Sequence, residues 1–247
     1  MKQELFTIKK NIPLNETVYL MELEGDTLSL TRPGQFVNIQ IDGCYLRRPI
    51  SVADYKEGEM MLIYRVVGRG TEAMRQMPVG KALDILMGLG NGYDVEPAGN
   101  RPLLVGGGVG VPPLYGLCRR LIDNGATVQA VLGFRTAADA FFADEFRALG
   151  ADVTVTTEDG SLGLCGFATK GMQSVAEKGG YTYLYSCGPE PMLRAVHGAA
   201  ITNGQYSFEE RMGCGFGACM GCSCKTKYGS KRICKDGPVL YGEEIVW

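Results

Sequence analysis

Residues 102–125 have the sequence PLLVGGGVGVPPLYGLCRRLIDNG, and this stretch decides how the middle of the chain folds. "PLLVGGG" predicts a buried strand, and "PPLYGLCRRLIDNG" predicts a helix that Gly125 closes. The glycines between them, Gly108 and Gly110 among them, would let a ligand approach the backbone, and the helix N-terminus offers free N–H groups to a diphosphate. Pro113 stands where the G-x-G-x-x-G fingerprint has its last glycine. The dinucleotide signature is therefore half met, and a plain tight turn is the alternative.

The same alternation of strand and helix continues downstream. "TVQAVLGF", "DVTVTT" and "YTYLYSC" predict strands, and "AADAFFADEFRALG", "GMQSVAEKGG" and "EPMLRAVHGAA" predict helices. Repeated units of this kind build a parallel sheet that is covered on both faces. "YSCGPEPML" places Cys187 and Gly188 at the carboxyl end of a strand, where such sheets bind ligands. Cys187 is either a small buried residue or a neighbour of a nicotinamide.

Upstream of residue 97 the pattern is β-like. "TVYLMEL", "QFVNIQI", "RPISVAD" and "MMLIYRVV" are short runs with turn residues between them, which predicts a small antiparallel barrel. "EPAGNRP" interrupts the pattern, and the alternation is expected to stop near residue 205. We therefore predict three units: a flavin-binding β-barrel over residues 1–98, an NAD-binding α/β unit over 99–204, and a small iron–sulfur unit over 205–247.

"YLRRPISVADY" offers a second candidate ligand site. Arg48 could hold a phosphate and Ser51 a polar ring edge, while Pro49 fixes the backbone between them. The alternative is that Arg48 is a solvated surface arginine and Ser51 an ordinary strand serine, because these would produce the same motif.

The C-terminal stretch "RMGCGFGACMGCSCKTKYGSKRIC" holds five of the nine cysteines. Cys214, Cys219 and Cys222 have the C-x4-C-x2-C spacing of a plant-type two-iron, two-sulfur loop, and Cys234 follows a predicted hairpin that turns at Gly229. We assign these four cysteines as cluster ligands and leave Cys224 spare.

Glycines between those cysteines are expected to let the backbone wrap the cluster at positive φ. A disulfide knot is disfavoured because the N-terminus lacks the apolar core of an export signal. A structural zinc site stays open, although zinc ribbons usually carry two C-x2-C pairs. Cys44, Cys118, Cys165 and Cys187 are expected to be inert packing residues.

The composition excludes several partners. A formal charge of −2, from 25 basic and 27 acidic residues, gives no bulk attraction to nucleic acid or an anionic membrane. No apolar run approaches a membrane span, so a soluble cytoplasmic protein is expected. His197, the one histidine, is expected on a helix surface without a role, and no nucleophile–base pair is visible.

Together, the Arg-x-x-Ser strand motif, "GVGVPP" and "CGPEPM" resemble the ferredoxin–NADP reductase superfamily, whose members bind FAD on a barrel and a nicotinamide nucleotide on an α/β domain. With "CGFGACMGCSC…ICKDGPV" added, the whole chain resembles the electron-transfer subunits of class 1B dihydroorotate dehydrogenases. That resemblance implies FAD contacts at Arg48, Pro49, Ile50, Ser51, Ile63, Tyr64, Arg65, Gly70 and Thr71.

The resemblance also implies a [2Fe-2S] cluster on Cys214, Cys219, Cys222 and Cys234, and NAD as the electron acceptor. The implied partner is an FMN-containing catalytic subunit that oxidises dihydroorotate to orotate, in a heterotetramer with two copies of each chain. Arg135 leaves NADP open, because an arginine there could meet a 2′-phosphate. The alternatives are a flavin subunit of a ferredoxin–NADP transhydrogenase or a sulfhydrogenase and, from another class, a non-catalytic zinc-stabilised nucleotide-binding module.

Overall fold

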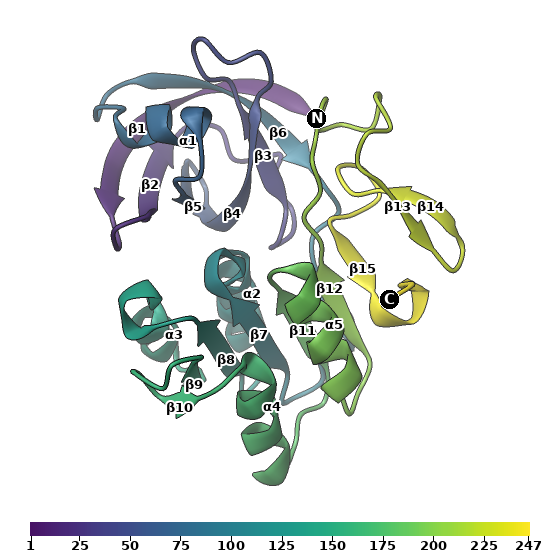
Figure 1. Cartoon of the computed structure of the whole chain (residues 1–247). Coiled ribbons are helices and arrows are strands. Elements are labelled where there is room, and N and C mark those ends of the chain that lie inside the picture. Colours follow the sequence, from purple (N-terminus) through teal and green to yellow (C-terminus); the bar gives the residue numbers. More distant parts are fainter.

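The computed structural model describes all residues from 1 to 247. Figure 1 shows a barrel above a sheet that carries helices, with the cysteine-rich end of the chain lying beside both. None of the helices combines the length and the apolar character that crossing a membrane requires.

The first unit is a closed antiparallel barrel with the strand order β1-β2-β5-β4-β3-β6. Its core holds alternate side chains of each strand, for example Leu83, Ile85 and Met87. The four strands named from sequence are confirmed. The first and last strands were not predicted. In the first strand, the many charged residues mask the alternation of the few apolar side chains that point into the barrel. The elements are β1 (Lys2–Pro13), β2 (Val18–Glu24), β3 (Phe36–Ile39), β4 (Arg48–Lys56), β5 (Glu59–Arg65), α1 (Arg69–Arg75) and β6 (Ala82–Leu89).

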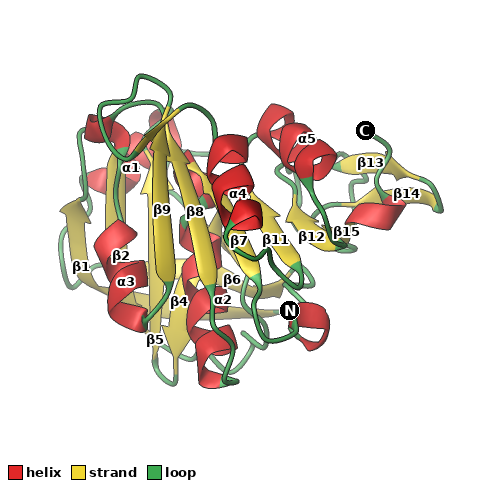
Figure 2. Cartoon of the chain, turned by 90° about the horizontal axis from the view of Figure 1, so that it is seen from below, coloured by secondary structure: helices red, strands yellow, loops and turns green.

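The second unit is a seven-stranded sheet of order β10-β9-β8-β7-β11-β12-β15, in which only β15 runs antiparallel to its neighbour. Helix α2 packs with α3, and α4 packs with α5, so both faces are covered (Figure 2). The predicted parallel sheet is confirmed. Its elements are β7 (Leu103–Gly107), α2 (Pro112–Asp123), β8 (Gln129–Phe134), α3 (Ala143–Leu149), β9 (Asp152–Thr157), β10 (Leu164–Cys165), α4 (Ala168–Glu177), β11 (Leu184–Cys187), α5 (Glu190–Ala199), β12 (Gly204–Ser207) and β15 (Val239–Tyr241).

One predicted helix is broken. Residues 137–150 form a 3₁₀ turn at Ala137–Asp139, then an irregular segment, and only then α3. The break lets both phenylalanines of the segment enter the core: the Phe141 ring lies 5.5 Å from that of Phe134, and the Phe142 ring lies 5.1 Å from that of Tyr115. Phe142 adopts a left-handed φ of 66° to reach its place. Core packing overrides local helix propensity here.

The strand series runs past residue 205, where the sequence pattern seemed to end. Strand β12 extends to Ser207, and β15 returns from the cysteine-rich segment to pair with it. Between them lies the predicted hairpin, β13 (Ser223–Thr226) with β14 (Gly229–Arg232). Its tip is Lys227 and Tyr228, and Gly229 follows at a φ of 113°. The three unit boundaries stay a prediction.

The C-terminus folds back on its own chain. The Trp247 ring lies 4.9 Å from the His197 ring and packs on Tyr206 and Phe208. His197 is therefore half-buried against an aromatic cluster rather than free on the surface of α5, which corrects the expectation from sequence. That contact holds the last residues of the chain against the sheet.

Candidate functional site

The Arg-x-x-Ser motif lies at the start of β4, next to β3. Ser51 pairs with Phe36 and Pro49 with Asn38, while Ile50 and Arg48 pair with Val37 and Ile39 of the same strand. Because opposite residues of paired strands share a face, Pro49 and Ser51 lie on the side away from Val37 and Ile39, which are buried in the barrel core. Pro49 and Ser51 are thus turned to the outside of the barrel.

Arg48 and Arg65 form no ion pair with any carboxylate. The Arg48 side chain lies across Gly70, where a Cβ would fall 2.2 Å from its Nε, so glycine permits this placement of the arginine. The Nε of Arg65 is buried without a hydrogen-bond partner, and a Cβ at Gly108 would lie 3.4 Å from its Nη2. Two guanidinium groups from the barrel therefore lie without carboxylate partners, one against Gly70 of α1 and one beside the glycine loop of the sheet.

The other residues of these segments support the backbone. The Thr71 hydroxyl accepts hydrogen bonds from the N–H groups of Val67 and Gly68, which fixes the turn into α1. The Tyr64 hydroxyl donates to Oδ1 of Asn11 at 3.1 Å, and burial raises the pKa of Tyr64. The Ile63 side chain is 4% exposed. The side chains of Ile63 and Tyr64 are thus packed inside the protein.

The two glycine loops of the sheet meet. Strands β7 and β11 are parallel neighbours with Gly106 opposite Cys187, and a Cβ at Gly110 would fall 2.2 Å from the carbonyl oxygen of Cys187. Gly188 follows at the start of the next loop. The structure brings these residues together at the carboxyl ends of the strands, beside the N-terminus of α2. Burial raises the pKa of the Cys187 thiol to about 12, although hydrogen bonds with Ser207 and Tyr93 act to lower it, so the thiol stays protonated.

Helix α2 fixes the sheet against the barrel. Gly116 allows the close approach, since a Cβ there would lie 2.8 Å from the carbonyl oxygen of Ala53 in β4. Arg119 donates from Nε to Asp54 Oδ2 at 3.0 Å and from Nη2 to the carbonyl of Tyr55 at 2.9 Å. The strand that carries Arg48 and Ser51 is therefore attached to the helix that follows the glycine loop.

The cysteine-rich loop brings its sulfurs together in two pairs. The Cys214 sulfur accepts from the backbone N–H of Cys219 at 3.4 Å and interacts with the Cys219 thiol. The Cys222 sulfur accepts from the N–H of Cys234 at 3.4 Å and interacts with the Cys234 thiol. No group of three or more His, Cys, Asp or Glu side chains is close enough to hold a single metal ion. The arrangement is two pairs rather than one cage.

The pairs differ in exposure and in acidity. Cys222 and Cys234 are 2% and 1% exposed, whereas Cys219 is open to solvent. Burial, and then the hydrogen bond with Cys222, raises the pKa of Cys234 to about 12. Partial burial acts to raise the pKa of Cys214 too, but backbone N–H groups of Cys219, Phe216 and Ala218 together lower it to about 6. Cys214 is therefore a thiolate at neutral pH, ready to bind metal.

The loop glycines behave only partly as expected. Gly215 and Gly217 adopt φ values of 78° and 91°, but Gly213 and Gly221 do not, and Met220 does at 61°. Gly213 serves another purpose, because a Cβ there would lie 3.2 Å from the Cys219 sulfur. Backbone N–H groups of the loop donate to the Cys214 and Cys219 sulfurs, while the reason for each glycine differs.

The remaining cysteines have separate places. Cys224 is half-buried on β13, paired with Lys231, and burial raises its pKa. Cys118 is fully buried, as expected of packing. Cys165 is exposed on the short edge strand β10, which corrects the expectation that it packs inside.

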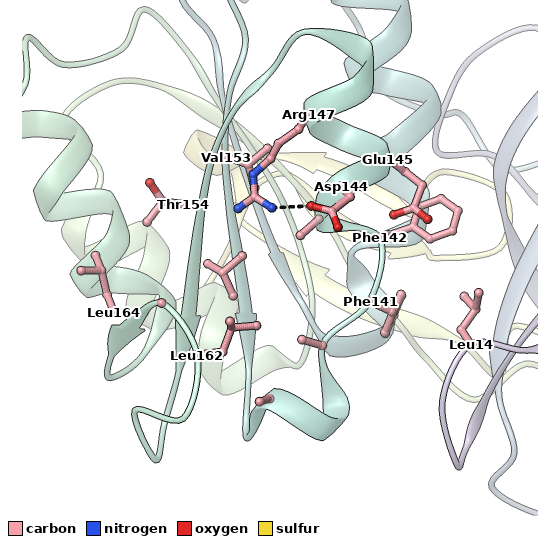
Figure 3. Close-up of a pocket in the computed structure, with 15 residues that line it drawn as sticks. Leu14, Phe141, Phe142, Asp144, Glu145, Arg147, Val153, Thr154, Leu162 and Leu164 are labelled. Atoms are coloured by element: carbon pink, nitrogen blue, oxygen red, sulfur yellow. Dashed lines mark hydrogen bonds and ion pairs between the residues drawn. The ribbon is translucent and has the colours of Figure 1, made fainter.

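Two further features lie away from these motifs. Arg135 is 73% exposed and forms an ion pair of 3.6 Å with Asp139. A cavity of about 720 Å³ opens between α3, β9 and Leu14 of the barrel, with Asp144 paired to Arg147 at its rim (Figure 3). None of the residues singled out from sequence lines it.

Comparison with known protein families finds a match for the sheet and another for the cysteine-rich segment. Residues 104–198 match the oxidoreductase NAD-binding domain, and residues 209–246 match the iron–sulfur cluster binding domain of dihydroorotate dehydrogenase B. The chain is 31% identical, with a TM-score of 0.89 over 98% of its length and 90% of the other chain, to a structure of the NADH-dependent reduced ferredoxin–NADP oxidoreductase. An Amycolatopsis cytochrome P450 reductase, at 22% identity and a TM-score of 0.71, covers 80% of this chain and 65% of its own, and shares the fold.

Whole-chain relatives are closer in sequence. The chain is 42% identical over 99% of its length to a protein of Shouchella clausii and 40% identical over 99% to one of Fusobacterium nucleatum, covering 98% and 99% of those proteins. Both are named dihydroorotate dehydrogenase B (NAD(+)), electron transfer subunit. This chain therefore belongs to the family of dihydroorotate dehydrogenase B electron transfer subunits.

Proposed function

We propose that this chain passes electrons from the FMN of a dihydroorotate-oxidising partner subunit, through a [2Fe-2S] cluster and FAD, to NAD⁺. The observation that carries the proposal is the position of the thiol pairs. Phe36, whose strand pairs with the Arg-x-x-Ser strand, belongs to the same apolar cluster as Cys222 and Cys234. An iron–sulfur site and a flavin site would then share β3 as a common support.

The donor set fits two irons. A [2Fe-2S] cluster needs two thiolates on each iron, and the Cys214–Cys219 and Cys222–Cys234 pairs supply them. Cys224 stands outside both pairs. The N–H groups of Ala218 and Gly221 already donate to loop sulfurs, at 3.2 Å and 3.5 Å, and donors of this kind stabilise a negatively charged cluster. These contacts support the two-iron type, with Cys214, Cys219, Cys222 and Cys234 as ligands.

The barrel residues fit FAD. Arg48 and Arg65 are cations without carboxylate partners, which suits the two negative charges of a diphosphate. The Ser51 hydroxyl lies on the outer face of β4, where it would bond to the polar edge of an isoalloxazine ring. Gly70 and Thr71 shape the turn under Arg48. Bound flavin supplies the exchange between single electrons and a hydride.

The sheet residues fit a nicotinamide nucleotide. Gly108 and Gly110 leave the backbone open at the start of α2, whose N-terminal N–H groups would face the diphosphate. Cys187 and Gly188 close the other side of the crevice, and the high pKa of the Cys187 thiol keeps it uncharged beside a nicotinamide ring. We propose NAD rather than NADP, because Arg135 is already paired with Asp139.

The partner is proposed to dock over the exposed end of the cluster loop. Cys219 is exposed, and Phe216 and Met220 beside it are 42% and 54% exposed, an apolar rim around the ligand that a partner's cofactor would approach. We propose a heterotetramer of two copies of each subunit, acting in the cytoplasm, where thiolate ligands stay reduced.

A second candidate is the flavin subunit of a ferredoxin–NADP transhydrogenase, favoured by the 31% identical neighbour that is named for such an activity. Relatives at 42% identity favour the dihydroorotate dehydrogenase partner. Affinity purification from the source cells separates the two. Recovery of an FMN protein that oxidises dihydroorotate supports our proposal, and recovery of a ferredoxin-dependent partner without FMN refutes it.

A further inference from the structure

Asn38 is a buried polar residue whose side-chain amide is only partly hydrogen-bonded within the chain. It lies in β3, is 1% exposed, and stands directly opposite Pro49 of the Arg-x-x-Ser motif. Nothing in the sequence singles it out, since an asparagine within "QFVNIQI" looks like an ordinary strand residue. Burial of an amide without partners is costly, so each of its polar atoms needs an account.

The amide nitrogen of Asn38 reaches the iron-binding loop. Its Nδ2 donates to the carbonyl oxygen of Cys214 at 3.4 Å, across 176 positions of the chain. Since that carbonyl can only accept, the nitrogen and not the oxygen of the amide must face it. Gly215 permits this close approach, because a Cβ there would fall 2.4 Å from Nδ2.

The amide oxygen of Asn38 has no partner. Oδ1 is buried and receives no hydrogen bond from any group of the chain. The backbone carbonyl of the same residue is already bound by the Arg47 guanidinium at 3.3 Å, and Arg47 also pairs with Asp84 at 2.9 Å. The strand is therefore fixed, and the free acceptor is held on the face that Pro49 and Ser51 share.

We propose that Asn38 is a positioning residue that links the two cofactor sites: Nδ2 holds the iron–sulfur loop at Cys214, and Oδ1 accepts a hydrogen bond from an N–H of the bound isoalloxazine ring. The inference rests on the proposed function for the identity of that donor. One consequence is thermodynamic: if flavin orders the Asn38 amide, flavin binding must stabilise the loop, and an assembled loop must strengthen flavin binding.

The test is hydrogen exchange of the backbone amides of residues 213–221, in the full chain with and without FAD. In the wild type, FAD should slow exchange of these amides. In Asn38→Leu, which keeps the size and removes both polar atoms, the cofactor-free loop should exchange about tenfold faster, the effect of one lost hydrogen bond. Added FAD should then leave loop exchange unchanged. Wild-type exchange in Asn38→Leu, or undiminished protection by FAD, would overturn the proposal.

Matched control variants distinguish a specific role of Asn38 from nonspecific destabilisation of the protein. Gln40→Leu changes a half-buried residue just after the end of β3, whose amide donates to the carbonyl oxygen of Cys44, and should leave loop exchange unchanged. Gly215→Ala and Gly217→Ala carry similar strain at positive φ, but only the first meets Asn38. Gly215→Ala should therefore be less than additive with Asn38→Leu, because part of its effect comes from the contact with the Asn38 amide, while Gly217→Ala should be fully additive. Full additivity of both would contradict the assignment.

The outcome separates this inference from the proposed function. If the chain bound neither FAD nor iron, the proposed function would fail, yet the cofactor-free comparison of wild type with Asn38→Leu would still decide whether Asn38 holds the loop. If both cofactors bound and Asn38→Leu matched the wild type, the proposed function would stand and this inference would fall.

Discussion

Asp54 in β4 and Arg119 in α2 form a two-point contact that joins the barrel to the parallel sheet. The guanidinium meets both carboxylate oxygens and also the neighbouring carbonyl of Tyr55. The Asp54 side chain is only 19% exposed. A flavin on the barrel and a nicotinamide on the sheet must meet at a fixed distance, and this contact sets the relation between the two supports.

Arg119→Met is expected to destabilise the protein by about 1–3 kcal/mol, because it leaves a shielded carboxylate without its charged donor. Urea unfolding would measure the loss. Arg147→Met is the control: it breaks a similar pair with Asp144, but that pair lies within one helix turn and its carboxylate is 92% exposed, so a change below about 0.5 kcal/mol is expected. Equal losses in both variants would contradict a special role for Arg119.

Cysteine-to-serine variants should divide into two groups. Serine at Cys214, Cys219, Cys222 or Cys234 should reduce bound iron and labile sulfide and bleach the visible absorption, because each removes a ligand from one pair. Serine at Cys224 should leave iron and sulfide at wild-type levels. A bleached Cys224→Ser with an intact Cys222→Ser would show that the ligand set has been assigned wrongly.

Arg65→Leu should weaken FAD binding by about tenfold to a hundredfold, since a charge-assisted contact to a diphosphate is lost. Titration of flavin-free protein with FAD would measure the change. Arg75→Leu removes an arginine whose guanidinium is already paired with Glu72 at 2.8 Å, and its FAD affinity should match the wild type. An unchanged affinity in Arg65→Leu would remove this residue from the flavin site.

His197 should titrate below its ordinary range. Burial first, and Lys227 second, lower its pKa from 6.5, so the folded state favours the neutral ring. As the pH falls from 6.5 to the lowered value, the unfolded chain takes up the proton first and the free energy of unfolding decreases; below that value the contribution is constant. Because the chain has one histidine, its proton magnetic resonance titration is unambiguous. A midpoint at or above 6.5 would contradict the packing against Trp247.

The sequence predicted those parts of the fold that repeat locally. The strand before Gly106 and the helix closed by Gly125 have clear periodicity and punctuation, and the cysteine spacing names a cluster without any knowledge of the fold. The sequence could not predict long-range packing. The break of the helix at Phe142 and the pairing of β15 with β12 depend on surfaces that meet only after folding. Asn38 escaped notice for the same reason, because its partner at Cys214 is supplied by another part of the chain.

The most direct measurement of the central claim is electron paramagnetic resonance of the purified chain after anaerobic addition of NADH, with iron, sulfide and FAD determined on the same sample. The account predicts about two irons and two sulfides per FAD, and a reduced two-iron signal that grows as NADH is consumed, because electrons pass from the nicotinamide through the flavin to the cluster. Zinc in place of iron, or a flavin that NADH bleaches while the cluster stays silent, would contradict it.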